Sequence, residues 1–292
     1  MKTNFIGTGV ALITPFNENK AVDFDALGKM IDYVIDGGVD YILIMGTTAE
    51  SATLDSEEKN KILNFAKQKI NCRVQIMYGI GGNNTSEIVE KIKHTDLSGV
   101  QGILSVTPYY NKPNQEGLYN HFAAIATVSP VEVILYNVPG RTGVNILPET
   151  VLRLVNDFEN ITAIKEASGS VEQIMNLIHK KPVDFTVISG DDALTLSLMS
   201  VGCEGVISVA ANAFPKEISQ MVNFALNNNF SEAVNYHYKL FESIKLMFAE
   251  GNPVGIKEYL TQKNLIKNEL RLPLVPASEN LATKIHHDLM RY

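Results

Sequence analysis

Several residue types that mark other classes of protein are scarce in this chain of 292 residues. It has no tryptophan and only two cysteines, Cys72 and Cys203, which are too far apart for a metal or redox motif. We therefore expect two reduced thiols in a cytoplasmic protein. No apolar run approaches the ~20 residues that cross a bilayer. Residues 1–7 also lack the apolar core of a signal peptide, so we expect no membrane association.

Positive charge is scarce as well, with 25 Lys and Arg against 32 Asp and Glu and a net charge of −7. Without a basic stripe, nucleic acid is not an expected partner. No His, Cys, Asp and Glu spacing is typical of a metal site, and we expect neither a metal nor a cofactor. The glycine-rich residues 79–84 lack both the GK[ST] of a phosphate-binding loop and the dinucleotide spacing, which leaves a tight strand-to-helix turn.

Short apolar runs alternate with helical patterns over most of the chain. The expected strands are residues 9–14, 41–45, 74–78, 102–106, 131–136, 161–165, 185–189 and 205–209. Most are continuously apolar, which is typical of parallel strands covered on both faces. The expected helix starts carry capping pairs at Asp55 and Glu58, Asn84 and Glu87, and Ser170 and Gln173.

Eight strands that alternate with helices predict an α/β protein with a (β/α)8 TIM barrel. A doubly wound sheet is the competitor, but residues 14–17 after the first strand do not form its glycine-rich turn. Strand signals end near residue 209, and helical stripes follow at 233–248, 252–263 and 277–290. We expect a barrel domain over residues 1–226 and a C-terminal helical domain over 227–292, whose role the sequence leaves open.

A lysine near the end of the apolar run 161–165 is the first candidate for chemistry. Lysine is rarely buried without a partner, because an ammonium group is costly to strip of water. An amine kept neutral in a dry pocket attacks carbonyls and forms a Schiff base. The structural alternative for Lys165 is a side chain that simply reaches solvent at the strand end.

Hydroxyl groups and one guanidinium follow the other expected strands, at the end where a barrel carries its active site. The candidates are Thr47, Thr48, Tyr110, Tyr136 and Arg141. Tyr and Thr hydroxyls relay protons because each donates and accepts, and Arg binds a second, anionic substrate. Aromatic capping of the rim and a surface arginine are the structural alternatives. Their coincidence at one rim favours Schiff-base chemistry on a keto-acid.

Three segments resemble a known family. Gly-Thr-Thr-Ala-Glu-Ser at 46–51, Tyr-Asn-Val-Pro-Gly-Arg-Thr at 136–142 and Ile-Lys-Glu-Ala-Ser at 164–168 are similar to the signature segments of the 4-hydroxy-tetrahydrodipicolinate synthase (dihydrodipicolinate synthase) family of pyruvate-dependent Schiff-base lyases. The resemblance covers essentially the whole chain. One departure is Ala49, where glycine is commoner in the family; a methyl group is tolerated there unless the backbone conformation demands glycine.

The resemblance implies a reaction between pyruvate and L-aspartate 4-semialdehyde on the route to diaminopimelate and lysine. Pyruvate would form an imine and then an enamine on Lys165, and the enamine carbon would attack the semialdehyde. Tyr136 would donate and accept protons, relayed through Thr47 to Tyr110, which in the family reaches into a neighbouring subunit's site. The family is typically a homotetramer built from two tight dimers.

The resemblance also assigns binding roles. Thr48 and Ile207 would contact pyruvate, Gly190 would line that pocket, and Arg141 would meet the semialdehyde carboxylate. Family members inhibited by lysine bind it at the dimer interface, and the matching positions here are Ser51, Ala52, Asn83, Glu87 and Tyr109. Ser56 and Lys59 stand where inhibited members often have histidines. Because Lys59 would repel a cationic effector, we expect weak or absent inhibition.

Two other functions remain open on sequence alone. N-acetylneuraminate lyase and the keto-deoxy-sugar-acid aldolases share the lysine and tyrosine, but Arg141 favours a short carboxylate over a polyol. A non-catalytic barrel that binds a keto-acid is the second alternative. It is disfavoured because no member of the expected lysine, tyrosine and threonine set is missing.

Overall fold

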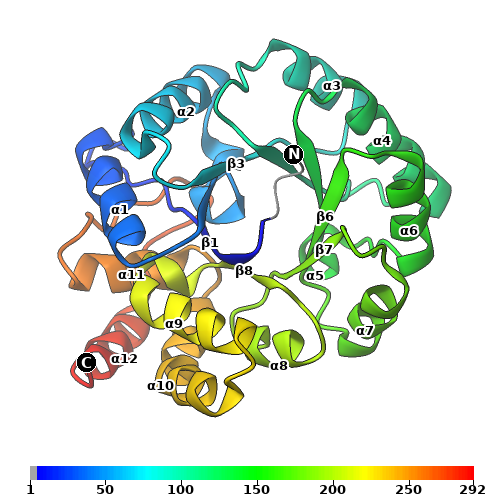
Figure 1. The fold of residues 1–292 in the computed structure, drawn as a ribbon. Coiled ribbons are helices and arrows are strands. Elements are labelled where there is room, and N and C mark those ends of the chain that lie inside the picture. Colours follow the sequence, from blue (N-terminus) through cyan, green and yellow to red (C-terminus); the bar gives the residue numbers. More distant parts are fainter. Residues whose placement is uncertain (1–4) are drawn as a thin grey trace. The chain divides into compact units, whose positions relative to one another are not determined.

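The computed structural model describes residues 5–292 and contains eight strands that form a closed barrel in chain order, each followed by helical structure (Figure 1). The strands are β1 (Gly7–Ala11), β2 (Tyr41–Ile44), β3 (Gln75–Gly79), β4 (Gly102–Val106), β5 (Glu132–Asn137), β6 (Ile161–Glu166), β7 (Thr186–Ser189) and β8 (Gly205–Ser208). Nearly all of their residues are buried, as parallel strands covered on both faces require. The predicted (β/α)8 barrel is confirmed.

The helices alternate with these strands and then continue beyond the last one. They are α1 (Phe24–Asp36), α2 (Ser56–Ile70), α3 (Thr85–His94), α4 (Gln115–Val128), α5 (Pro139–Thr142), α6 (Pro148–Asp157), α7 (Val171–Lys180), α8 (Thr195–Ser200), α9 (Pro215–Leu226), α10 (Phe230–Phe248), α11 (Val254–Gln262) and α12 (Glu279–Leu289). Three short 3-10 helices are η1 (Thr47–Ala49), η2 (Ser51–Thr53) and η3 (Ala210–Asn212). Within the described part of the chain, no helix is both long and apolar enough to span a bilayer.

The first strand differs from its expected range of 9–14, because it begins at Gly7 and ends at Ala11. The amide of Leu12 still reaches Leu43 O at 3.1 Å, but the amide of Ile13 donates to Asn212 Oδ1 at 3.1 Å. A side-chain acceptor thus replaces the neighbouring strand at this point. An apolar run alone cannot reveal that change of partner.

Two of the three expected capping pairs are confirmed. Asp55 and Glu58 form a reciprocal capping box at the start of α2, and Ser170 accepts an amide hydrogen bond at the start of α7. The pair at Asn84 and Glu87 is wrong as a cap. The Asn84 side chain donates to Glu87 Oε1 at 2.8 Å and accepts no backbone amide, so α3 begins without a side-chain cap.

The described residues group into two compact units. Unit 1 comprises residues 5–6 and 75–207, and unit 2 comprises residues 7–74 and 208–292. In unit 1, α3, α4, α6 and α7 lie along one face of the sheet (Figure 1). In unit 2, the C-terminal helices are grouped with β1, β2 and α2. The expected division at residue 226 stays a prediction.

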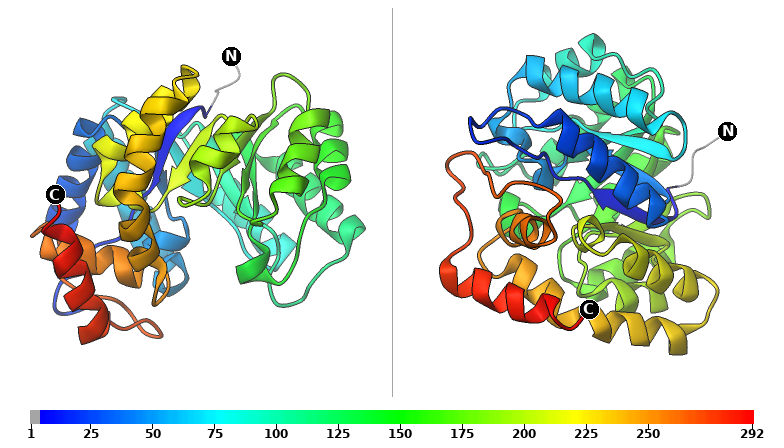
Figure 2. Two further views of the ribbon diagram at one scale, coloured as in Figure 1. Left: turned by 90° about the horizontal axis from the view of Figure 1, so that it is seen from below. Right: turned by 90° about the vertical axis from the view of Figure 1, so that its left-hand side faces the viewer.

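The C-terminal helices pack on one another and on α9 (Figure 2). Their contacts include a polar cluster, in which Asp288 of α12 accepts from Tyr259 Oη at 2.8 Å and from Ser243 Oγ at 2.5 Å. The Tyr259 ring also meets Phe214 edge-on, with centroids 5.9 Å apart. Tyr259 and Ser243 are fully buried, so this appendage has a packed interior of its own.

A buried ion pair joins α11 to the segment that follows β2. Lys257 Nζ lies 2.5 Å from Glu50 Oε1, and neither side chain is exposed. Lys257 also donates to Glu269 O at 2.9 Å. Burial lowers the pKa of Lys257 to about 8, against the opposing effect of Glu50. Each charge is therefore tolerated only because the other is present.

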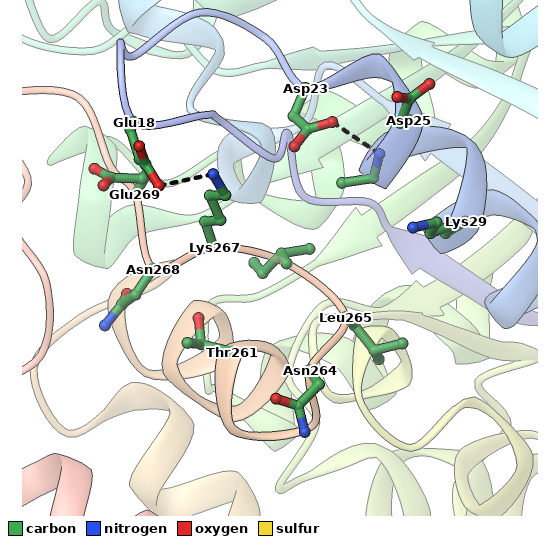
Figure 3. Close-up of a pocket in the computed structure, with 12 residues that line it drawn as sticks. Glu18, Asp23, Asp25, Lys29, Thr261, Asn264, Leu265, Lys267, Asn268 and Glu269 are labelled. Carbon is green, nitrogen blue, oxygen red and sulfur yellow. Dashed lines mark hydrogen bonds and ion pairs between the residues drawn. The ribbon is translucent and has the colours of Figure 1, made fainter.

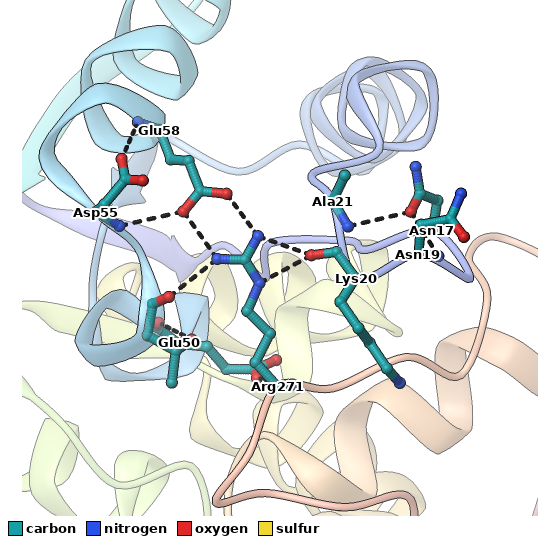
Figure 4. Close-up of polar contacts among 9 residues, drawn as sticks. Asn17, Asn19, Lys20, Ala21, Glu50, Asp55, Glu58 and Arg271 are labelled. Carbon is teal, nitrogen blue, oxygen red and sulfur yellow. Dashed lines mark hydrogen bonds and ion pairs between the residues drawn. The ribbon is translucent and has the colours of Figure 1, made fainter.

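The tail is not helical between α11 and α12, in line with the gap between the expected helices at 252–263 and 277–290. Arg271 in this stretch reaches the same segment (Figure 4). Its guanidinium forms a fork on Glu58, at 2.8 and 2.5 Å, and donates to Thr53 O at 2.9 Å. Its backbone amide donates to Glu50 Oε2 at 3.0 Å. Residues 46–58 are thus fastened to the tail by side-chain and backbone contacts.

Replacing one member of the buried pair tests this attachment. Lys257→Met leaves Glu50 buried without its counter-ion, and we expect the free energy of unfolding to fall by about 3–5 kcal/mol. Lys267→Met is the matched control, because its partner Glu18 lies 2.8 Å away and both side chains are mostly exposed. The control should cost less than about 1 kcal/mol. Urea unfolding at one protein concentration measures both, and equal losses would contradict the assigned role of Lys257.

Candidate active site

Lys165 lies inside unit 1 as the penultimate residue of β6, and only 5% of its surface is exposed. In the sheet register it pairs with Tyr136 of β5 and with Ile188 of β7, so the three side chains share one face. Its Nζ lies 4.5 Å from the centroid of the Tyr136 ring, and Tyr136 is 7% exposed. No described carboxylate forms an ion pair with this amine. The structure thus brings together the predicted nucleophile and the predicted proton carrier.

Gly190, directly after β7, makes room for this lysine. A Cβ at position 190 would lie 3.0 Å from Lys165 Cε, 3.1 Å from its Cγ and 2.8 Å from Ala167 Cβ. The Gly190 amide donates to Glu166 O at 2.8 Å, which holds the backbone in place. The absence of a side chain at position 190 thus makes room for the lysine, whereas a role of Gly190 in lining a pyruvate pocket stays a prediction. Ile207, the other predicted pyruvate contact in this unit, is 1% exposed in β8.

The opposite face of the same two strands carries a buried polar network that the sequence analysis did not assign. Asn137 Nδ2 donates to both oxygens of Glu166 at 3.1 Å and to Asn145 Oδ1 at 2.8 Å. Glu166 also accepts from the Ser168 amide at 2.8 Å. Burial raises the pKa of Glu166, against these hydrogen bonds. The network fixes the strand ends immediately beside the reactive pair.

The sequence contains a pattern that predicts this network. Asn137 and Glu166 directly follow Tyr136 and Lys165, and consecutive strand residues point to opposite faces. Polar residues at the ends of two otherwise apolar strands therefore predict a second polar cluster behind the first. Their pairing in the register, Asn137 with Glu166, required the structure.

Arg141 lies on α5, a single turn after β5, and is exposed. Thr142 stabilises this turn with two hydrogen bonds to Val144. Its hydroxyl donates to Val144 O at 2.9 Å and accepts from the Val144 amide at 3.2 Å. Gly143 ends the turn in the left-handed region at φ +71°, which favours glycine. Within the described residues the Arg141 guanidinium has no hydrogen-bond or ion-pair partner. It is a free cation on a rigid turn, suited to an incoming anion.

Tyr110 is the most exposed aromatic residue among the large hydrophobic side chains, with 89% of its surface accessible. Its φ of +73° places it in the left-handed region, which costs a residue with a Cβ roughly 1–2 kcal/mol. The turn is held by Asn111 N, which donates to Tyr109 O at 2.9 Å. An exposed phenol on a strained backbone is not explained by packing within its own unit.

The two threonines lie in unit 2, in the 3-10 turn η1 that follows β2. Thr47 is exposed, whereas Thr48 is 2% exposed and its hydroxyl accepts a hydrogen bond from Asn252 Nδ2 at 3.0 Å. Ala49 has an ordinary 3-10 backbone, so the methyl group is tolerated as expected; the left-handed residue here is Glu50, at φ +53°. The sequence offers no reason to assign Asn252 to the site, because no local pattern links it to Thr48, 204 positions earlier in the chain.

The five positions matched to a lysine pocket divide between the two units. Asn83 Nδ2 donates to Tyr109 O at 3.2 Å, so these two are neighbours in unit 1. Glu87 is exposed on α3. Ser51 and Ala52 lie in η2 of unit 2. A lysine-binding role for this set stays a prediction.

A charged cavity of about 660 Å³ lies in unit 2, between the start of α1 and residues 264–269 (Figure 3). Several of its groups are already engaged: Asp23 caps α1 through the Ala26 amide at 2.9 Å, and Glu18 pairs with Lys267 at 2.8 Å. Among residues 5–292, no group of three or more His, Cys, Asp or Glu side chains is placed to hold a metal ion.

In this barrel a buried lysine amine faces a tyrosine ring, and a glycine leaves space for the lysine side chain. This arrangement is typical of a lysine-dependent lyase of the Schiff-base class. The comparisons agree. The sequence model of the Dihydrodipicolinate synthetase family matches residues 4–291, and the chain belongs to that family. The predicted resemblance is confirmed.

Individual relatives cover nearly the whole chain. A curated 4-hydroxy-tetrahydrodipicolinate synthase of Flavobacterium psychrophilum is 52% identical over 281 residues, which cover 96% of each chain. The crystal structure of dihydrodipicolinate synthase from Aquifex aeolicus superposes with a TM-score of 0.96 at 41% identity, covering 99% of this chain and 98% of the other. A dihydrodipicolinate synthase from Cyanidioschyzon merolae with lysine bound matches with a TM-score of 0.94 at 35% identity, covering 98% and 97%.

Gly190→Ala tests whether the glycine admits the lysine. The new methyl group would collide with the Lys165 stem and move its amine, and a displacement near 1 Å costs about 10²-fold in rate. We expect covalent trapping of pyruvate with borohydride to slow by that factor. Gly82→Ala is the control, because a Cβ there meets only Ile88 at 3.6 Å. Undiminished trapping by folded Gly190→Ala would show that the glycine is not needed for the position of the amine.

Proposed function

We propose that this protein condenses pyruvate with L-aspartate 4-semialdehyde to give 4-hydroxy-tetrahydrodipicolinate, in the diaminopimelate route to lysine. One observation carries the proposal: the Lys165 amine is buried without a counter-ion and lies against the Tyr136 ring. Membership of the Dihydrodipicolinate synthetase family, and relatives with this activity in their names, support the choice of substrates.

The reaction begins at Lys165. Its nitrogen adds to the keto carbon of pyruvate, and the resulting carbinolamine loses water to form an imine. Loss of a methyl proton gives the enamine, whose carbon attacks the aldehyde of the second substrate. The amine of that substrate then adds to the imine carbon, which closes the ring and expels the lysine amine. No step needs an oxidant or a reductant.

Tyr136 moves the protons of these steps. Its ring centroid lies 4.5 Å from the amine, and a phenol both donates and accepts. Thr47 relays the proton onward to Tyr110. The exposure and strained backbone of Tyr110 suit a phenol that completes the site of a second copy of the chain. We therefore propose a homo-oligomer, a tetramer made of two tight dimers, in which activity depends on assembly.

Binding is divided between the two substrates. Thr48 donates to the pyruvate carboxylate, while Ile207 and Gly190 line the pocket around its methyl group. Arg141 offers an unpaired guanidinium on a rigid turn to the carboxylate of the semialdehyde. We expect weak or absent inhibition by lysine at the positions matched to a lysine pocket, because the side chain of Lys59 would repel a cationic effector. The two cysteines are unpaired, which suits a cytoplasmic location.

The sugar-acid aldolases remain the second candidate chemistry, since they use the same imine. The family match and the named relatives favour the synthase reaction instead. A purely binding role would give no task to the buried Lys165 amine that lies against the Tyr136 ring.

Lys165→Ala tests the covalent step. Borohydride reduction in the presence of pyruvate should add one pyruvate-derived mass to the wild type and none to this variant, because the amine that attacks pyruvate is gone. Lys267→Met, which alters an exposed ion pair, should keep the adduct. Intact-mass spectrometry gives the result. An unmodified wild-type protein would refute the proposed chemistry.

Arg141→Ala tests the division of labour between substrates. Loss of a charge-assisted contact should raise KM for the semialdehyde by about 10- to 100-fold, and pyruvate trapping should not change. Arg153→Ala is the control, because this exposed arginine pairs with Glu116 on the outer helices. Steady-state kinetics with each substrate varied in turn separates the two effects. If Arg141→Ala also prevented the pyruvate adduct, the assignment of Arg141 to the second substrate would be wrong.

A further inference from the structure

We infer that Asn252 is a positioning residue that turns the hydroxyl proton of Thr48 toward the pyruvate carboxylate. The inference rests on the proposed function. It assigns a task to the C-terminal appendage, because Asn252 lies directly before Pro253, the N-cap residue of α11. The decisive contact is the hydrogen bond from Asn252 Nδ2 to Thr48 Oγ1, 3.0 Å long and buried.

The direction of this hydrogen bond matters. A threonine hydroxyl has one proton to donate, and the oxygen also accepts. Once Asn252 donates to the oxygen of Thr48, the hydroxyl proton must point elsewhere, and no other hydrogen bond of Thr48 is found among residues 5–292. A free, oriented donor is what a carboxylate requires. If the Asn252 amide were turned over, its oxygen would take that proton and Thr48 would have nothing to offer.

The burial of Thr48 and Asn252 makes their hydrogen bond hard to replace. Thr48 is 2% exposed and Asn252 is 9% exposed, so water does not readily replace either partner. The Oδ1 atom of Asn252 is buried and has no partner among the described residues. A buried acceptor without a hydrogen-bond partner lowers the stability of the folded protein. We take this loss of stability as a sign that the amide nitrogen at the other end of the Asn252 side chain has a function.

The appendage also holds the backbone that carries Thr48. Glu50, two residues later, adopts a left-handed conformation, and its carboxylate pairs with Lys257. The same carboxylate accepts a hydrogen bond from the Arg271 amide (Figure 4). The turn η1 is therefore fixed on one side through the Glu50 carboxylate and on the other through the Asn252 hydrogen bond. Both anchors come from residues after 250 in the same unit.

The experiment titrates pyruvate in the borohydride trapping reaction, so that the second substrate plays no part. Asn252→Ala frees the Thr48 hydroxyl to rotate, and the half-saturating pyruvate concentration should rise about 3- to 10-fold. Asn252→Asp keeps the shape but can only accept, so it should take the Thr48 proton and raise that concentration further. A packing role predicts the reverse order, because Asp preserves the volume that Ala removes.

A double-mutant cycle separates orientation from the charge that Asp introduces. Thr48→Val removes the hydroxyl, and in that background Asn252→Ala should have no further effect on pyruvate saturation. Asn229→Ala is the control variant, since Asn229 caps α10 in the same appendage. It should lower the melting temperature and leave pyruvate saturation unchanged. If Asn252→Ala does not fold, Asn252→Ser replaces it, because its short hydroxyl does not reach Thr48.

The outcomes are distinct. A higher half-saturating concentration for Asn252→Ala, absent in the Thr48→Val background, supports the inference. Wild-type saturation in folded Asn252→Ala, or the same effect with and without the Thr48 hydroxyl, overturns it while the proposed function stands. A wild-type protein that forms no pyruvate adduct refutes the proposed function itself.

Discussion

The structure depends on one constraint: a long, basic side chain is kept inside a barrel without a counter-ion. Lys165 is accommodated by what surrounds it, since Tyr136 presents its ring to the amine and Gly190 leaves space for the methylene stem. The buried network of Asn137 and Glu166 behind the two strand ends keeps that space from closing or shifting. Chemistry follows from the arrangement, because a buried amine that no carboxylate engages is available to add to a carbonyl carbon.

A second buried lysine shows why burial alone does not define the nucleophile. Lys257 is more completely buried than Lys165, and burial lowers its pKa to about 8. Yet Lys257 lies 2.5 Å from Glu50 and donates to Glu269 O, so its nitrogen is committed to structure. Lys165 has no such partners. The difference between a structural and a reactive lysine here is the presence of a carboxylate, and the structural one serves the loop that carries the threonines.

Much of the fold could be predicted from local patterns. Continuous apolar runs identified the eight strands, and the capping box at Asp55 and Glu58 identified the start of α2. Lys165, Tyr136 and Gly190 could be placed at one end of the barrel because each follows or ends a predicted strand. Two local predictions failed for different reasons. The end of β1 is set by Asn212, a partner about 200 residues away, whereas the side chain of Asn84 bonds to Glu87 three residues later instead of capping its helix. The contacts of Asn252 with Thr48 and of Lys257 with Glu50 join residues about 200 positions apart, which no local pattern encodes.

The most direct test of the account is to locate the covalent site. Protein reduced with borohydride in the presence of pyruvate is digested, and the modified peptide is identified by tandem mass spectrometry. The account predicts a single pyruvate-derived modification on the nitrogen of Lys165, with Lys257 unmodified in spite of its lowered pKa. A modification on Lys257 or on any other lysine, with Lys165 left free, would contradict it.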